Sequence, residues 1–467
     1  MDGGFKRKKG SELVRKFEDC LKKQQFSFFE LEDYEEIISY YTYNDKPKSA
    51  IRAIKQAEGQ FPFSVEIMLL KAQSFINIEN YNEALKVLDA AETFQPNEAE
   101  IFMIRGSLFS LQNKVKSALQ EFKKALLFAE NKDDVYYHLG VLEQSQENYD
   151  RAIEYFELSL EENVYNENVL YDLAYCLDVT GRAKDSISYY EKFIDAEPYS
   201  YFAWYNLGIV YSKIGQVEDA RDAYEYAVII EEEFASAHFN LGNAYLQLET
   251  YSKALDSFYK TLDLEGPSAD LYNMLGTVYE KMEQFDLGLK YFQKAAKLEI
   301  LNHQAWYGAG LCMSQLDRWL EAVHFFNKAL KINTENGVYW QAIANADYKV
   351  GNLISSLDAY EEASLLMPHN YEIWIDWSYV YFEQGDISRA LLTIERGLEE
   401  LPENAELLYR LAAYFIADNN YKDAFKSLEN ALILDYEKHT VLLEFFSNLS
   451  TQKALFKIID KFRKDHS

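Results

Sequence analysis

Residues 201–234 read YFAWYNLGIVYSKIGQVEDARDAYEYAVIIEEEF, and residues 235–268 read ASAHFNLGNAYLQLETYSKALDSFYKTLDLEGPS. Aligned, they place Gly208 over Gly242 and Ala220 over Ala254. The same 34-residue spacing runs from residue 31 to residue 438 without insertion or deletion. Position 20 of the repeat is always small: Ala50, Ala84, Ala118, Ala152, Ser186, Ala220, Ala254, Gly288, Ala322, Ser356, Ala390 and Ala424. A small residue at a fixed position predicts that two helices touch there.

Two further kinds of position repeat with the same period. Position 8 is small in every repeat except the first, where Ile38 stands. Positions 4 and 24 are rich in aromatic rings, such as Trp204 and Tyr224. We interpret each repeat as a helical hairpin whose two helices meet at positions 8 and 20. The rings at positions 4 and 24 are then expected to fill the space between neighbouring hairpins.

Glycine and proline fall where hairpins need turns. Glycine follows the expected first helix at Gly181, Gly215, Gly351 and Gly385, where a left-handed residue ends a helix at low cost. Most prolines occupy position 32, between hairpins, and Pro47 stands where a second helix should begin. No proline interrupts a predicted helix.

The pattern resembles the tetratricopeptide repeat family. Its best local match comprises Trp204, Leu207, Gly208, Tyr211, Gly215, Ala220, Tyr224 and Ala227, and a second comprises Leu241, Gly242, Tyr245, Tyr251, Ala254 and Phe258. The resemblance implies an all-α fold, an α-solenoid of twelve 34-residue hairpins that form a right-handed superhelix. It also implies a concave face that binds peptides or protein segments, in a scaffold, adaptor or co-chaperone and not in an enzyme.

The expected organisation has four parts. Residues 1–10 are a basic disordered tail, and residues 11–30 hold an N-terminal capping helix with Ser11 as N-cap and an apolar stripe. The repeats fill residues 31–438, with starts at residues 31, 65, 99, 133, 167, 201, 235, 269, 303, 337, 371 and 405. Residues 439–467 are expected to form a C-terminal capping hairpin in which Leu442, Leu455 and Phe456 are among the residues that pack inward.

Composition constrains the compartment and the partner. The chain carries a formal net charge of −29, which disfavours nucleic acid and favours a basic protein or peptide. Cys20, Cys176 and Cys312 are expected to be unpaired thiols, which suggests a reducing compartment and a cytoplasmic location. No apolar run is long enough to cross a bilayer, and the N-terminus lacks the apolar segment of a secretory signal.

No motif for chemistry emerges. The glycines sit at packing positions and turns, so there is no phosphate-binding loop, and the seven histidines lack paired metal-ligand spacing. We therefore expect no catalytic residue, no metal and no cofactor.

The candidate binding surface is the inner face, to which positions 2, 5, 9, 12 and 13 are expected to point. Rings at position 5 are not required by the packing pattern above, and tyrosine and asparagine suit peptide binding. The candidate peptide-binding residues are Tyr137, Tyr171, Tyr175, Tyr205, Asn206, Phe239, Asn240, Asn243, Tyr307, Asn345 and Tyr379. They predict a groove centred on repeats four to nine. Alternatively, these rings only shield the backbone and touch one another across the superhelix.

Two functions remain open from the sequence. The first is a protein–protein interaction scaffold or adaptor that binds an extended segment in the groove. The second is a structural or assembly protein that uses its convex face or its basic ends, including self-association; residues 1–25, for example, carry eight Lys/Arg and four Asp/Glu. The oligomeric state is not determined by the sequence, although a monomer is favoured.

Overall fold

The computed structural model describes residues 2–23, 28–445, 455–457 and 459–460. Within these residues the chain is helical and contains no strand, as predicted. Its contacts divide it into two compact units, residues 1–232 and 233–467. Each unit is described by itself.

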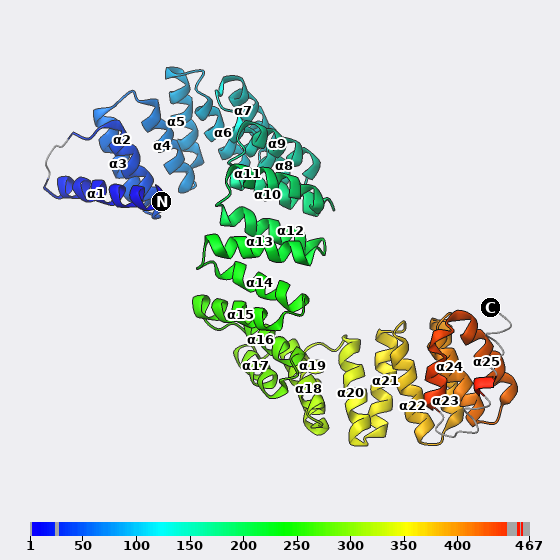
Figure 1. Cartoon of the computed structure of the whole chain (residues 1–467). Coiled ribbons are helices and arrows are strands. Elements are labelled where there is room, and N and C mark those ends of the chain that lie inside the picture. The colour runs from blue at the N-terminus through cyan, green and yellow to red at the C-terminus, as the bar shows by residue number, and fades with distance from the viewer. Residues whose placement is uncertain (1, 24–27, 446–454, 458, 461–467) are drawn as a thin grey trace. The chain divides into compact units, whose positions relative to one another are not determined.

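The first unit is a series of helices in consecutive packed pairs, preceded by one further helix (Figure 1). Its elements are α1 (Asp2–Lys23), α2 (Leu31–Tyr43), α3 (Pro47–Gln60), α4 (Val65–Asn77), α5 (Tyr81–Phe94), α6 (Ala99–Leu111), α7 (Val115–Phe128), α8 (Asp133–Ser145), α9 (Tyr149–Glu162), α10 (Glu167–Val179), η1 (Ala183–Ser186), α11 (Ile187–Ala196), α12 (Tyr201–Lys213) and α13 (Val217–Ile230).

The second unit continues the same arrangement, and Figure 1 shows α20 to α25 side by side in chain order. Its elements are α14 (Ala235–Gln247), α15 (Tyr251–Glu265), α16 (Ala269–Lys281), α17 (Phe285–Leu298), α18 (His303–Gln315), α19 (Trp319–Ile332), α20 (Gly337–Val350), α21 (Leu353–Leu366), α22 (Tyr371–Glu383), α23 (Ile387–Glu400), α24 (Ala405–Ala417), α25 (Tyr421–Leu434), η2 (Glu437–His439) and α26 (Thr440–Phe445).

Local sequence sets the helix ends. Asn302 and Asn404 cap α18 and α24, because their side chains accept hydrogen bonds from the backbone N–H of Ala305 and Leu407 at 2.9 and 3.0 Å. The turn inside each hairpin uses the left-handed region at position 15. Gly351 adopts it there with φ +90°, as predicted, and Glu283 adopts it with φ +58°.

Small residues bring the two helices of a hairpin together, as predicted. Ser356, at position 20, is fully buried, and its hydroxyl donates to the backbone carbonyl of Ala344 at position 8, at 2.8 Å. In the pair formed by α16 and α17, a Cβ added to Gly288 would lie 3.2 Å from the carbonyl oxygen of Gly276. Side chains larger than alanine or serine at position 20 would therefore force the helices apart.

The ring at position 24 packs differently from the expectation. It covers the glycine at position 8 of its own hairpin rather than only the gap to the next hairpin. A Cβ added to Gly242 would lie 2.6 Å from Cε1 of Phe258, and one added to Gly310 would lie 2.4 Å from Cε1 of Phe326. The missing side chain makes room for the ring, so each hairpin contains part of its own core.

Tryptophans at position 4 connect a hairpin to the loop before it. The indole N–H donates to the carbonyl six residues earlier in four hairpins, over 2.9–3.0 Å: Trp204 to Pro198, Trp306 to Ile300, Trp340 to Thr334 and Trp374 to Pro368. Each bond satisfies both a ring donor and a loop acceptor.

The N-terminal helix differs in extent from the prediction. It begins at Asp2, so Ser11 lies inside α1 and is not its N-cap, and residues 2–10 are helical instead of disordered. Lysine and arginine are good helix formers, which allows the basic segment to continue the helix despite its glycines. The stripe packs as expected: Val14 and Phe17 are buried against Tyr34 and Ile37 of α2.

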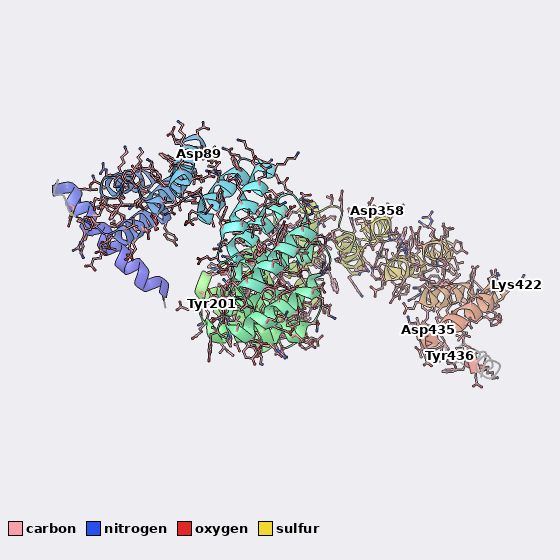
Figure 2. All side chains as sticks on the ribbon, turned by 90° about the horizontal axis from the view of Figure 1, so that it is seen from above. Asp89, Tyr201, Asp358, Lys422, Asp435 and Tyr436 are labelled. Carbon is pink, nitrogen blue, oxygen red and sulfur yellow. The ribbon has the colours of Figure 1, made fainter. Side chains whose placement is uncertain are left out.

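The C-terminal end is partly described. Asp435 and Tyr436 directly follow α25, at the end of the helix opposite Lys422 (Figure 2). Leu442, Leu455 and Ile459 are buried against α24 and α25. Phe456 is exposed, so its predicted inward packing is wrong, because the buried side of this segment is taken by Leu455 and Ile459.

Candidate functional site

The candidate peptide-binding residues all lie on the first helices of their pairs. The first unit holds Tyr137 on α8, Tyr171 and Tyr175 on α10, and Tyr205 and Asn206 on α12. The second unit holds Phe239, Asn240 and Asn243 on α14, Tyr307 on α18, Asn345 on α20 and Tyr379 on α22.

The rings at position 5 take part in packing, contrary to the expectation that the core does not need them. Four of them lie against the ring at position 24 of their own hairpin, with centroids 5.6–6.0 Å apart. The pairs are Tyr137 with Phe156, Tyr205 with Tyr224, Phe239 with Phe258 and Tyr307 with Phe326. Such pairs stabilise the hairpin beyond their buried area. These four rings therefore contribute to the packing of their own hairpins, although each keeps part of its surface exposed.

The remaining residues of the first unit fall into two groups. Asn206 is buried, and its amide donates to the carbonyl of Phe202 in its own helix at 2.9 Å, so that donor is used inside α12. Tyr171 and Tyr175 are exposed by 52% and 46%, and the ring of Tyr171 lies tilted against that of Phe202, with centroids 6.4 Å apart. These two tyrosines present open aromatic surface on α10.

The second unit contains a pocket of about 510 Å³ that three of the candidates line. Tyr307, Asn345 and Tyr379 contribute from the three successive first helices α18, α20 and α22. The other lining residues are Leu311, Ser314, Trp319, Phe326, Val338, Gln341, Ala342, Tyr348, Lys349, Tyr360 and Asp376. Phe239, Asn240 and Asn243 lie on α14, outside this lining.

Hydrogen bonds fix the polar side chains of the pocket. The hydroxyl of Tyr360 donates to the amide oxygen of Asn345. Tyr379 donates to Glu383 at 2.9 Å, and Tyr348 donates to the other oxygen of the same carboxylate. The amide oxygen of Asn345 is therefore engaged by Tyr360, and the phenol rings of Tyr348 and Tyr379 are held in place by Glu383.

Asp376 introduces a charge into this pocket. It is half-buried on α22, and burial raises the pKa of its carboxyl to about 6. Neighbouring Glu372 raises that pKa further, while Arg410 opposes the shift. Asp376 was not predicted from the sequence, because only positions 2, 5, 9, 12 and 13 of the repeat were expected to point to the inner face. The signal was available: Asp376 occupies position 6, the same as Asn206 and Asn240, and stands between Ile375 and Trp377.

The described residues contain neither a metal-binding group nor a membrane-spanning helix. Among the residues that the structure describes, no group of His, Cys, Asp and Glu side chains could hold a metal ion. None of the described helices is both long and apolar enough to cross a membrane.

Comparison with known proteins identifies the family. A tetratricopeptide repeat model matches residues 36–99, 69–135, 205–269, 273–336 and 375–436, and a second model of the same repeat matches residues 133–163. The matches cover more than half of the chain, which therefore belongs to the tetratricopeptide repeat family. This family is generally non-catalytic, and its repeats support a protein-interaction scaffold with protein or peptide partners.

Three solved structures are among those that match the chain. YrrB, described as a tetratricopeptide repeat protein with an unusual peptide-binding site, is 25% identical over 39% of this chain and 95% of its own, with a TM-score of 0.34. Cut9–Hcn1 of the APC/C is 14% identical over 82% and 89%, with a TM-score of 0.42. MamA is 26% identical over 35% and 95%, with a TM-score of 0.34. No curated protein matches the chain.

Proposed function

We propose that the chain is a non-catalytic scaffold that binds an extended segment of another protein in the pocket lined by α18, α20 and α22. The observation that carries the proposal is the composition of this pocket, in which side chains of three consecutive hairpins face one cavity. A segment bound there would touch the same positions of successive repeats.

The chemistry of the lining supports a peptide ligand. Tyr307, Tyr348 and Tyr379 supply apolar area with little rotamer entropy to lose. Asn345 and Gln341 supply amide N–H donors that can pair with backbone carbonyls, while their amide oxygens already accept from Tyr360 and Asn370. The volume of about 510 Å³ lies within the range of about 300–1,000 Å³ that is typical of ligand pockets. The net charge of −29 favours association with a basic partner.

The compartment is also a proposal. Cys176 and Cys312 are buried and unpaired, and Cys20 is half-buried and unpaired. Three reduced thiols are consistent with the cytoplasm.

The test is selection from a random peptide library by the full chain, followed by affinity measurement on the selected peptides. Ala342→Arg would fill the pocket from the half-buried surface of α20, and arginine is a good helix former. Ser355→Arg, on the exposed surface of α21, is the matched control with the same added charge. Tyr205→Ala and Phe239→Ala are unsuitable, since both rings pack within hairpins.

We expect the selected peptides to lose binding to Ala342→Arg and to keep it with Ser355→Arg, while both variants unfold at the wild-type temperature. Equal binding of the peptides to both variants would show that they bind outside this pocket. It would then favour the alternative of a convex-face or assembly contact.

A further inference from the structure

The carboxylate of Asp376 lines the pocket without a partner. Among the described residues, none lies within hydrogen-bond or ion-pair distance of its side-chain oxygens. Burying a carboxylate costs free energy unless it is paired, and burial accordingly raises the pKa of this group to about 6. Asp376 therefore has no direct ion-pair partner in the free protein, and Arg410 acts on it only from a distance.

The walls around Asp376 suit a cation. Tyr307, Trp319, Tyr348 and Tyr379 line the same pocket. The faces of these rings carry partial negative charge and attract ammonium and guanidinium groups. Glu383, which accepts from both Tyr348 and Tyr379, adds a further negative charge beside the pocket.

Neither Arg410 nor Lys349, the cations near this pocket, forms an ion pair with Asp376. Arg410 of α24 lies over the rings of Tyr379 and Phe445, with its Cζ 5.8 and 4.9 Å from their centroids. It lowers the pKa of Asp376 from a distance, without pairing with it. Lys349 of α20 is exposed, and its Nζ lies 5.9 Å from the ring centroid of Tyr348.

We propose that this pocket takes the ammonium or guanidinium end of a lysine or arginine side chain from the bound segment, with Asp376 as its counter-ion. The proposal rests on the function proposed above and narrows the partner to a peptide with a basic anchor residue. The rings would enclose the cation and its aliphatic stem. The amides of Asn345 and Gln341 would hold the adjoining backbone. Lys349, being exposed, can turn away as the ligand enters.

The test repeats the peptide selection with the full chain and two variants. Asp376→Asn keeps the shape of the side chain and removes its charge. Glu362→Gln removes one charge from the exposed surface of α21, outside the pocket lining, and controls for net charge. We expect wild type and Glu362→Gln to select peptides with one recurrent lysine or arginine, and Asp376→Asn to lose that preference.

The selected peptide then serves as the probe, beside a copy in which glutamine replaces the basic residue. Wild type should bind the basic peptide about tenfold or more tightly than the copy, since that fold-change corresponds to one modest charge–charge contact. Asp376→Asn should bind both alike. Peptides without a basic preference, or a preference that Asp376→Asn retains, would overturn this inference and leave the scaffold function standing. Failure of wild type to select any peptide would overturn both.

Peptide affinity measured as a function of pH distinguishes a counter-ion from a residue with a purely structural role, because only the counter-ion makes the affinity depend on its ionisation. The groups that face Asp376 are Glu372 on α22, Tyr360 on α21, Lys349 on α20 and Arg410 on α24. If only the ionised carboxylate binds, affinity for the basic peptide should fall about tenfold between about pH 7.5 and pH 5. In Asp376→Asn this dependence should vanish. An unchanged pH profile in that variant would count against Asp376 as the counter-ion.

Discussion

Replacing Gly242 with alanine would place a methyl group 2.6 Å from Cε1 and 2.7 Å from Cδ1 of Phe258. Phe258 is fully buried and also packs against Phe239, whose ring centroid lies 5.7 Å away, so the ring has little room to move. Overpacking of this kind costs about 1–3 kcal/mol. Alanine recovers up to about 1 kcal/mol through its higher helix propensity. We expect a net loss of about 1–2 kcal/mol.

A double-mutant cycle separates the clash from other effects of the substitution. Phe258→Leu removes the ring edge that the new methyl group meets, at its own cost of about 1–3 kcal/mol. In that background Gly242→Ala should cost little or should stabilise, so the two changes should couple by at least about 1 kcal/mol. Urea unfolding followed by circular dichroism measures all three variants. Strictly additive effects would refute the inference that the ring at position 24 requires glycine at position 8 of its own hairpin.

Three other substitutions test separate features. Glu283→Gly should stabilise the chain by up to about 1 kcal/mol, because Glu283 holds a left-handed conformation with φ +58°; destabilisation in thermal unfolding would contradict this reading of the turn. Asp376→Asn should stabilise the chain by about 1–3 kcal/mol near pH 7.5, because the folded-state pKa of Asp376 is raised to about 6 from 3.8. The native state binds the proton more tightly than the unfolded state, so this gain should shrink as the pH falls through 6 and vanish near pH 4. A pH-independent gain in urea unfolding would exclude this cause. Trp374→Phe should cost about 1 kcal/mol or more through the lost bond to the Pro368 carbonyl, whereas wild-type stability of that variant would show the bond to be dispensable.

The helical pairs could be predicted well from the sequence, because two kinds of residue mark them. Small residues such as Ala254 mark the contact between the two helices of a hairpin, and left-handed glycines such as Gly351 mark the turn between them. A fixed period reports contacts that recur, and the close approach of Ser356 to Ala344 is one of them. The start of α1 was not predictable in the same way, because that segment lies outside the period and its glycines argued against a helix.

The candidate site was predicted only in part, for a different physical reason. Tyr307, Asn345 and Tyr379 line the pocket, whereas the ring of Tyr205 packs within its own hairpin. Position within a repeat tells which way a side chain leaves the helix, but not which ring it will meet. Asp376 occurs once, so no periodicity marks it, and its importance depends on burial and on the absence of a direct ion-pair partner among its described neighbours.

The indole bonds between hairpins have a consequence for how this chain can change length. In four linkers the tryptophan ring reaches the carbonyl six residues before it, so the connecting segment must keep one length for the donor and acceptor to meet. One added residue would separate them and leave an orphaned carbonyl and an orphaned N–H in the same loop. The hydrogen bond therefore fixes the number of residues in each of these linkers, which gives a physical reason for the constant 34-residue spacing across them. Growth or loss of the array would then proceed by whole hairpins rather than by single residues.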